Sequence, residues 1–246
     1  MLTIVFKPYK NGLGGLGLIK QKIKQMGHKC FEIKTKNSNF VERNHYHIFD
    51  WGKQGNNKLV QYNKFTSGIG AWFVAPYTES KEHAAKWINN GLKVLCRTTL
   101  NGHGGQGIVV ASSIDDLVDA PLYTQYVPKQ REFRIHVFHH TDESISFKVR
   151  EKRRRNGFNE NAQANKYVRN HDNGWVFCDE LKAPLMEEAF LIASVAVREV
   201  TGKYGAVDIG YHSKHGHIVY EVNSAPGCDN ATAQWYADCF VRDASL

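Results

Sequence analysis

The chain has 246 residues, of which 42% are apolar or aromatic, and its formal net charge at pH 7 is +8. This composition excludes bulk disorder, because disordered chains combine few bulky apolar residues with a high net charge. The length allows one large domain or two packed ones and excludes three. The excess of Lys and Arg favours an acidic partner, such as a nucleic acid, a nucleotide, an anionic peptide or a phosphorylated metabolite.

The sequence predicts a cytosolic protein with reduced thiols. No stretch approaches the roughly 20 apolar residues that a membrane-spanning helix needs, and the N-terminus has neither the apolar core nor the cleavage site of a secretory signal. The cysteines are scattered and never spaced as CxxC: Cys30, Cys96, Cys178, Cys228 and Cys239. We therefore expect neither a disulfide framework nor a zinc site.

The first sixty residues predict a small parallel α/β layer. The pattern indicates a helix at Leu18–Met26, which Gly27 ends, and strands at Leu2–Lys7, Cys30–Lys34 and around His45–Trp51. Strands that alternate with a helix favour a parallel sheet, because parallel strands need a crossover connection.

A GxGxxG spacing formed by Gly12, Gly14 and Gly17 lies between the first strand and this helix. Such a spacing is typical of a dinucleotide site when the first glycine ends the strand, but here residues 7–11 separate the two. A contact with an anion or a substrate at the helix N-terminus is therefore favoured over a dinucleotide site.

After Asn63 the pattern changes to short, mostly antiparallel strands mixed with helices. One helix is expected at Lys81–Asn90, with Ser80 as its N-cap. A longer helix at Pro184–Thr201, ended by Gly202, has one apolar stripe and should cover a sheet. Strands are expected at Trp72–Pro76, Lys93–Arg97, Ile108–Ala111 and Leu122–Val127.

The segment Tyr204–Gly227 predicts two strands joined by a turn at Ser213–Gly216. With a four-residue turn, Asp208 lies opposite Glu221, and Asn223 follows on the same face. Opposite carboxylates destabilise a strand pair unless something bridges them, and two carboxylates with one amide oxygen suit Mg²⁺. The alternative is a pair of solvated carboxylates on an exposed face. The flanking apolar residues and the abrupt Asn-Ser-Ala-Pro-Gly stop favour the metal site.

Four glycines lie between two predicted strands: Gly102, Gly104, Gly105 and Gly107. A strand follows them where a dinucleotide site would have a helix, so that reading is not favoured. A glycine loop between antiparallel strands can instead fold over phosphates, because backbone N–H groups approach the anion closely. Arg97, on the strand that enters the loop, can add positive charge there. The alternative is a flexible hairpin turn.

Two strands within Tyr123–Arg155 alternate polar and apolar side chains. Their polar positions are Glu132, Arg134, His136, Lys148, Arg150 and Lys152. If the connecting loop has an odd number of residues, the two polar faces coincide and form a basic platform with one carboxylate. Such a surface can neutralise a triphosphate and the charge that develops as its terminal phosphoryl group transfers. The alternatives are a solvated sheet face and a nucleic-acid footprint, above all for Arg153–Arg155.

Taken in order, these segments resemble the ATP-grasp superfamily, and within it the carboxylate–amine ligases of the ribosomal-protein glutamate ligase type and their phage-encoded relatives. The resemblance covers about residues 63–227 and is strongest in GAVDIG and YEVNSAPG. It implies an α/β (α+β) fold in which a small Rossmann-like domain, residues 1–62, precedes an ATP-grasp domain, residues 63–246. The nucleotide lid is then expected at about 63–121 and a metal-binding subdomain at about 122–246.

The resemblance also implies ligands and the residues that bind them. Two Mg²⁺ ions are expected, held by Asp208, Glu221 and Asn223. ATP is expected to contact Lys64, Arg97, Gly102, Gly104, Gly105 and Gly107 with its phosphates, and Gln125, Tyr126 and Val127 with its adenine; Glu132 and Arg134 match the pattern that follows this hinge. Lys148 is expected to add a phosphate contact, and the substrate-orienting residue is expected among Arg150, Arg169 and Asn165.

The resemblance implies a ligase in which ATP phosphorylates a carboxylate and an amine attacks the acyl phosphate, giving an amide, ADP and phosphate. The expected partners are a carboxylate and an amine substrate, either of which an acidic peptide, a protein or a nucleic acid can carry. Two alternatives stay open. One is an ATP-grasp phosphotransferase that does not ligate. The other is a basic nucleic-acid-binding protein, although the sequence has no helix-turn-helix, aromatic RNA-binding motif or zinc pattern.

Overall fold

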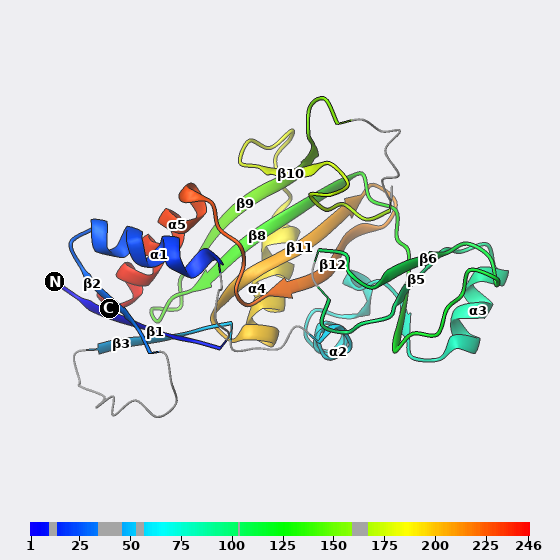
Figure 1. Ribbon diagram of the computed structural model, residues 1–246, viewed down its shortest axis with the longest axis horizontal. Coiled ribbons are helices and arrows are strands. Elements are labelled where there is room, and N and C mark those ends of the chain that lie inside the picture. Colours follow the sequence, from blue (N-terminus) through cyan, green and yellow to red (C-terminus); the bar gives the residue numbers. More distant parts are fainter. Residues whose placement is uncertain (10–13, 34–45, 53–56, 103, 159–166) are drawn as a thin grey trace.

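A computed structural model describes residues 1–9, 14–33, 46–52, 57–102, 104–158 and 167–246. The largest sheet of these ranges lies in the middle of the molecule, with a smaller sheet toward each end of the long axis (Figure 1). None of the helices in these ranges is long and apolar enough to cross a membrane. A small parallel sheet followed by antiparallel sheets confirms the mixed α/β class predicted from the sequence.

The small N-terminal sheet is parallel, as its alternation of strands and helix predicts. β1 (Thr3–Pro8) is the middle strand, with β2 (Lys29–Glu32) and β3 (Tyr46–Trp51) on its two sides. α1 (Gly14–Gln25) follows β1 and contributes three buried side chains to the core of this sheet: Leu16, Ile19 and Ile23. Residues 34 and 45, at the ends of two expected strands, lie outside the described residues.

The sheet nearest the other end, called the lid sheet below, is antiparallel and has the strand order β4-β7-β5-β6. α3 (Lys81–Asn89) begins at the predicted N-cap Ser80, whose hydroxyl accepts a hydrogen bond from the backbone N–H of His83 at 3.1 Å. The strands of the lid sheet are β4 (Tyr77–Thr78), β5 (Val94–Arg97), β6 (Ile108–Ala111) and β7 (Leu122–Gln125).

The prediction of a strand at Trp72–Pro76 is wrong. Trp72 and Phe73 belong to the 3₁₀ turn η1 (Ala71–Phe73), Val74 makes an isolated β-bridge, and the last two residues are in no helix or strand. Gly70 precedes the turn with a φ of 92°, a conformation that interrupts an extended chain. Trp72 is therefore not packed in a sheet, and its side chain is 89% exposed.

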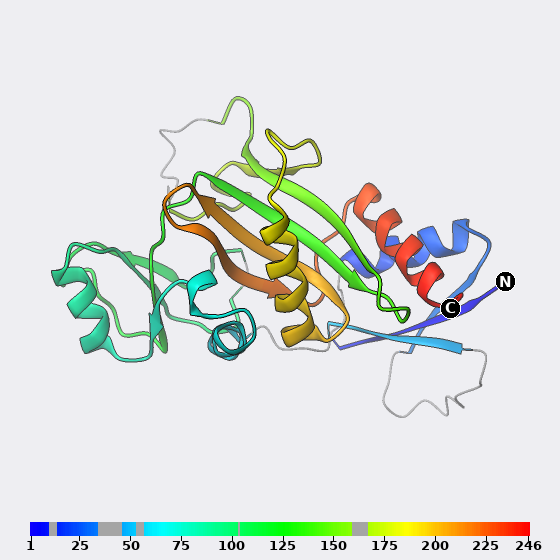
Figure 2. The same ribbon diagram turned by 180° about the vertical axis from the view of Figure 1, so that it is seen from behind.

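The central sheet is antiparallel and has the strand order β10-β9-β8-β11-β12. Its strands are β8 (Arg131–His139), β9 (Ile145–Arg154), β10 (Trp175–Cys178), β11 (Tyr204–His212) and β12 (Gly216–Asn223). α4 (Glu187–Thr201) ends at the predicted Gly202 and packs on β8, β11 and β12, as seen in Figure 2. The expectation that this helix covers a sheet is confirmed.

Pro184 is not the first residue of α4, contrary to the prediction. The helix begins at Glu187, because the backbone just before it is held in other contacts. The backbone N–H of Lys182 donates to the Glu151 carboxylate at 2.8 Å, and the carbonyl of Ala183 accepts from an arginine of β8 at 2.8 Å. These two hydrogen bonds hold a bend at residues 182–183, just before the position where the pattern predicts a first helical turn.

The sequence pattern does not predict α2 (Lys58–Gly68). Its buried positions include Lys58 and Gln61, so its apolar stripe is interrupted by polar residues. The Gln61 side chain donates to the Val222 carbonyl at 2.9 Å and accepts from the Val222 N–H at 3.0 Å, which ties α2 to the edge strand β12. α2 also packs on α4, the helix that covers the central sheet. The domain boundary expected after residue 62 therefore falls inside a helix that packs with the central sheet.

The pattern also does not predict α5 (Asn230–Asp243), which packs on α1 although the rest of the chain separates the two. The core of the N-terminal sheet includes side chains of both helices. Phe6 and Phe240, for example, lie edge to face with ring centroids 4.9 Å apart. The C-terminal helix therefore packs with the N-terminal sheet, whereas the sequence places it in a subdomain at about 122–246.

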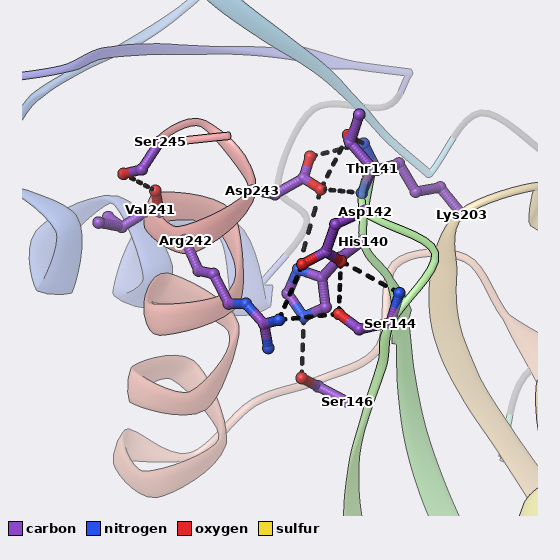
Figure 3. Close-up of polar contacts among 10 residues, drawn as sticks. All are labelled: His140, Thr141, Asp142, Ser144, Ser146, Lys203, Val241, Arg242, Asp243 and Ser245. Carbon is purple, nitrogen blue, oxygen red and sulfur yellow. Dashed lines mark hydrogen bonds and ion pairs between the residues drawn. The ribbon is translucent and has the colours of Figure 1, made fainter.

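A cluster of hydrogen bonds fastens the turn between β8 and β9 to the end of α5 (Figure 3). The buried Asp243 carboxylate accepts from the backbone N–H of Thr141 at 2.7 Å, from its hydroxyl at 3.0 Å and from Lys203 Nζ at 2.6 Å. His140 lies beside it, with its Nε2 atom 2.8 Å from the Ser146 hydroxyl. Burial lowers the pKa of His140, so its ring is neutral at pH 7.

Asp243→Ala is expected to lower the free energy of unfolding by about 3 kcal/mol, because three donors lose a buried, charged acceptor. Urea denaturation measures this loss. Asp238→Ala is the matched control, since Asp238 is exposed on the same helix and contacts only Gln234 in the described hydrogen bonds. Its effect should stay within about 0.5 kcal/mol. Equal losses for the two variants would show that the cluster does not stabilise the fold.

Candidate active site

A cavity of about 600 Å³ lies between the lid sheet and the face of the central sheet opposite α4. β8, β9, β11 and β12 supply side chains to its floor, and the glycine loop between β5 and β6 covers part of it. Most residues expected from the sequence line this one cavity: Arg97, Gly104, Gly105, Gln125, Tyr126, Val127, Glu132, Arg134, Arg150, Arg169, Asp208, Glu221 and Asn223.

Four charged side chains form one row across four strands of the floor. In the strand register, Arg150 is opposite Arg134, Arg134 is opposite Asp208, and Asp208 is opposite Glu221. Residues directly opposite on antiparallel strands have close β-carbons on the same face. The row therefore brings two cations and two carboxylates together, and it confirms that Asp208 and Glu221 face each other.

The register is reached by a different route from the predicted four-residue turn. His212 pairs with Gly216, so the turn contains the three residues 213–215. A bulge between Asp208 and Ile209 on one strand and Val219 and Glu221 on the other then adds the missing residue. The two differences cancel, and the two carboxylates lie opposite each other as predicted.

The polar faces of β8 and β9 coincide, as predicted for a loop with an odd number of residues. His139 pairs with Ile145, so the loop contains the five residues 140–144, and His136 pairs with Lys148. His136 is fully buried, and burial lowers its pKa to about 3. It is therefore a neutral member of an otherwise basic platform, and its Nδ1 atom lies 3.1 Å from the Tyr236 hydroxyl.

Asp208 is paired with Arg134 in a buried, two-pronged salt bridge. Arg134 Nε donates to one carboxylate oxygen at 2.7 Å, and its NH2 group donates to the other at 2.8 Å. Burial opposes the charge of Asp208, but Arg134, Lys152 and Lys58 outweigh it and lower the pKa of this carboxyl to about 2. Asp208 is therefore ionised throughout the physiological range.

Glu221 is held by Lys58 and Asn223. Lys58 Nζ, on a side chain only 7% exposed, forms an ion pair and hydrogen bond with one carboxylate oxygen. The amide of Asn223 donates to the other oxygen at 3.1 Å. Burial and the charge of Asp208 oppose ionisation of Glu221, but Lys58 outweighs them and lowers its pKa. Both carboxylates of the pair are thus charged; Asp208 is buried, whereas the Glu221 side chain remains 25% exposed.

The donor set of this pair fits a magnesium ion. Within the described residues, no three His, Cys, Asp or Glu side chains cluster as a metal site. Asp208, Glu221 and Asn223 instead offer two ionised carboxylates and an amide oxygen from neighbouring strands, the hard oxygen ligands that Mg²⁺ prefers. Such a site would leave coordination positions for phosphate oxygens and water, because Mg²⁺ seldom takes all its ligands from a protein.

Glu132 forms the centre of a second buried charge cluster on the floor. Lys129 Nζ lies 2.8 Å and Lys152 Nζ 2.6 Å from its two carboxylate oxygens, and Arg169 Nε lies 4.0 Å away. Burial opposes its charge, but Lys129 and Lys152 outweigh it and lower the pKa of Glu132. Burial also lowers the pKa of Lys129, whose ammonium lies 4.5 Å from the centre of the Tyr220 ring.

The glycine loop contacts the segment that precedes β10. Asn170 Nδ2 donates to the Gly104 carbonyl at 2.5 Å, and a β-carbon at Gly105 would come within 2.6 Å of Val168 Cγ1. Gly104 and Gly105 line the cavity, whereas Gly102 and Gly107 lie behind them, packed on Thr99 and outside the lining. The loop does join two antiparallel strands, β5 and β6, as predicted.

Several apolar and aromatic side chains also line the cavity. They include Leu95, Tyr126, Val127 and Tyr220, and Gln125 and Arg97 belong to the same lining. The strand that ends at Gln125 is held by backbone hydrogen bonds of 2.8 Å from Gln125 to Pro76 and from Tyr126 to Lys93. Arg97 lies over the Tyr62 ring, 5.8 Å from its centre, with its guanidinium toward the cavity.

Two aspartates that the sequence did not single out lie at the Arg150 end of the row. Arg150 lies 3.0 Å from Asp179 and 2.7 Å from Asp229, which also caps α5 by accepting from the Thr232 N–H at 2.9 Å. Lys148 does not line the cavity and lies 3.5 Å from Asp179. An aspartate at an N-cap position is the sequence signal that could have marked Asp229.

Arg169 lies over the Trp175 ring, 4.3 Å from its centre, and donates to the Lys129 carbonyl at 2.8 Å. Both Arg150 and Arg169 therefore line the cavity and are held in place by other side chains, Arg150 by Asp229 and Arg169 by Trp175. Asn165, the third candidate for the substrate-orienting residue, lies outside the described residues.

Lys64 does not reach the cavity, contrary to the expectation. It lies on the exposed side of α2, where its Nζ donates to the Glu199 carbonyl at 2.8 Å. Lys58, one and a half turns earlier and buried, is the lysine of α2 that contacts a candidate metal ligand. The signal that could have found it is Asn57, which caps α2 and makes Lys58 the first residue of a helix.

The known proteins most informative for this chain are solved structures. No protein-family model and no curated protein matches the chain. An N5-carboxyaminoimidazole synthetase from Staphylococcus aureus, complexed with ADP, matches with a TM-score of 0.66 and 13% identity over 99% of this chain and 77% of that chain. A D-alanyl-alanine synthetase A from Vibrio cholerae matches with a TM-score of 0.61 and 15% identity over 100% and 99% of the two chains.

A third match is an ATP-grasp ligase associated with RiPPs from Chryseobacterium gregarium, in complex with ADP and a leader and core peptide. Its TM-score is 0.62 and its identity 11%, over 98% of this chain and 97% of that chain. At such low identities the likeness is one of fold. The chain therefore has the ATP-grasp fold over nearly its whole length.

Proposed function

We propose that the chain is an ATP- and Mg²⁺-dependent ligase that joins a carboxylate to an amine through an acyl phosphate. The observation that carries this proposal is the row Arg150, Arg134, Asp208 and Glu221, in which two ionised carboxylates face each other beside fixed cations on the floor of the cavity. The GAVDIG and YEVNSAPG segments supply the two carboxylates of this row, Asp208 and Glu221, and support a ligase of the ribosomal-protein glutamate ligase type.

The residues divide into three roles on this proposal. Asp208, Glu221 and Asn223 would hold magnesium, which neutralises phosphate charge when bound. Arg97, the glycine loop and Lys58, in the role that the sequence assigned to Lys64, would bind the phosphates. The part of the cavity lined by Gln125, Tyr126 and Val127 would bind adenine.

The reaction needs positioned charges more than an activated protein nucleophile. A substrate carboxylate oxygen bonds to the terminal phosphorus of ATP as the bond to ADP breaks. The amine nitrogen then bonds to the acyl carbon, phosphate leaves, and the nitrogen loses a proton. Arg150 or Arg169 would stabilise the charge that develops on the acyl phosphate, because both guanidinium groups are fixed beside the cavity.

Gly105→Ala is expected to weaken ATP binding by about ten-fold or more, because a side chain there meets Val168 and strains a residue with a φ of 89°. Fluorescence or calorimetric titration with ATP and Mg²⁺ measures the affinity. Gly91→Ala is the matched control: its φ is 78°, but nothing lies within 4 Å of the added carbon, and it is outside the cavity. An ATP affinity unchanged in Gly105→Ala would contradict the role of the loop.

The proposal is tested by following ADP release and product mass together. The purified chain would be incubated with ATP, Mg²⁺ and a panel of amino acids, neutral and acidic peptides, and nucleic acids. ADP that appears only with both an acid and an amine, and a product lighter than their sum by one water, is the expected result. Peptides belong in the panel because a matched structure contains a leader and core peptide.

Other outcomes of the same experiment identify the alternatives. A phosphorylated product that accumulates without any amine would replace the ligase by a phosphotransferase on the same fold. Absence of ATP binding, together with nucleic-acid binding that weakens steeply with salt, would replace it by a basic nucleic-acid-binding protein.

A further inference from the structure

Both carboxylates of the candidate metal site already have protein cations as partners. The two oxygens of Asp208 accept from Arg134, and the two oxygens of Glu221 accept from Lys58 and Asn223. The charges of the two carboxylates are thus balanced by one guanidinium and one ammonium. A divalent cation that binds this pair has to compete with these partners for the same oxygens.

The two protein cations differ in how firmly they are placed. Arg134 grips Asp208 with two parallel hydrogen bonds and lies over the Phe177 ring, 4.5 Å from its centre. Lys58 makes a single-point contact with Glu221 at the end of a flexible four-carbon stem. Of the two cations, Lys58 is the one that can be displaced by breaking a single hydrogen bond, whereas displacing Arg134 breaks two parallel hydrogen bonds.

Lys58 also lies beside the place where phosphates would bind. It is the first residue of α2, and its backbone N–H donates to the Leu100 carbonyl at 2.9 Å, just before the glycine loop begins at Gly102. A polyphosphate under this loop would offer the ammonium group of Lys58 a second anionic partner. Lys58 thus lies between Glu221, a candidate metal ligand, and the glycine loop under which phosphates would bind.

We propose that Lys58 is an exchangeable counter-ion that blocks Glu221 from binding a metal ion until nucleotide phosphates draw the lysine away. Lys58 is then a positioning residue that makes metal binding depend on nucleotide binding. This inference rests on the proposed function, because it takes Glu221 as a metal ligand. By thermodynamic reciprocity, the metal ion raises the affinity for the nucleotide by the same factor.

The test measures Mn²⁺ binding to the full chain at pH 8 without nucleotide, by the electron paramagnetic resonance signal of free Mn²⁺. The wild-type chain is expected to bind Mn²⁺ weakly. Lys58→Met is expected to bind it about ten-fold more tightly, because the competing charge is gone. Lys58→Gln provides a second, polar replacement if the methionine variant does not fold.

Two control variants separate competition from a general change in charge. Lys58→Arg keeps the cation and should bind Mn²⁺ as weakly as the wild type. Lys64→Met removes a charge from the same helix, but Lys64 contacts the Glu199 carbonyl away from the cavity, so Mn²⁺ binding should not change. A similar gain in Lys64→Met and Lys58→Met would overturn the proposal, because net charge alone would then explain it.

Glu221→Gln distinguishes failure of this inference from failure of the proposed function. If Glu221→Gln abolishes Mn²⁺ binding but Lys58→Met does not tighten it, the counter-ion role is refuted and the metal site stands. If Glu221→Gln leaves Mn²⁺ binding unchanged, Glu221 is not a metal ligand, and the counter-ion role fails together with the metal assignment of the proposed function.

Discussion

Glu221→Gln is expected to reduce ligase turnover by about a thousand-fold or more, because the substitution removes an ionised ligand at the centre of the proposed metal site. The fold should survive, since the glutamine oxygen can still accept from Lys58, and its NH2 group can donate to the Asn223 side-chain oxygen once the Asn223 amide turns over. ADP release under saturating ATP and Mg²⁺ measures the effect, and thermal unfolding followed by circular dichroism checks the fold.

The control for this prediction is Glu188→Gln. Glu188 lies on α4, on the opposite face of the sheet, where its carboxylate contacts His217 at 2.5 Å. Turnover of Glu188→Gln should stay near that of the wild type, within about two-fold. Substantial turnover in Glu221→Gln with a natively folded chain would refute the metal assignment.

Arg134→Met is expected to lower the free energy of unfolding by about 3–5 kcal/mol, because it leaves Asp208 as a buried carboxylate without its main counter-ion. Urea denaturation measures the loss. Asp208→Asn in the same chain should restore part of the stability, since the uncompensated charge is removed along with its partner. If the double variant is no more stable than Arg134→Met, the buried charge is not the cause of the loss.

This effect should depend on pH in a defined direction. In the wild type, the pKa of Asp208 is lowered from its ordinary 3.8 to about 2. The ion pair therefore contributes its full stability above the pKa of the unfolded chain, and this contribution disappears as the pH falls through the lower value of the folded chain. The difference in stability between wild type and Arg134→Met is thus expected to be largest near pH 7 and to shrink between about pH 4 and pH 2.

The sequence was most informative about which side chains share a face of the sheet. The alternation of charged and apolar residues in β8 and β9 predicted that their polar faces coincide if the loop between them has an odd number of residues, because only the parity of the loop matters for the faces. That Arg134 lies opposite Arg150 depends on the actual loop length, which the alternation does not give. The pairing of Asp208 with Glu221 was also predicted, although a shorter turn and a bulge produce it. A β-bulge leaves little signal in a single sequence, so the route to the register could not be predicted.

The residues that the sequence did not place owe their positions to contacts distant in the chain. Lys58 and Gln61 are buried on α2 because Glu221 and Val222 provide them with partners, and polar residues at buried positions hide the helical pattern. Lys64 has the motif-like position, but its direction on the helix takes it away from the cavity. Helix direction relative to a site depends on tertiary packing, which periodicity alone does not contain.

The packing of α5 on the N-terminal sheet sets the order in which the chain can fold on the ribosome. Phe240 follows Phe6 by 234 residues, yet the two rings form one core. At typical rates of translation, roughly 10–50 s pass between the synthesis of the two residues. During that time the sheet lacks the helix that covers it, and its apolar side chains Ile4, Phe6 and Trp51 are accessible to chaperones or to other nascent chains. The N-terminal sheet is therefore made well before the helix that completes its core.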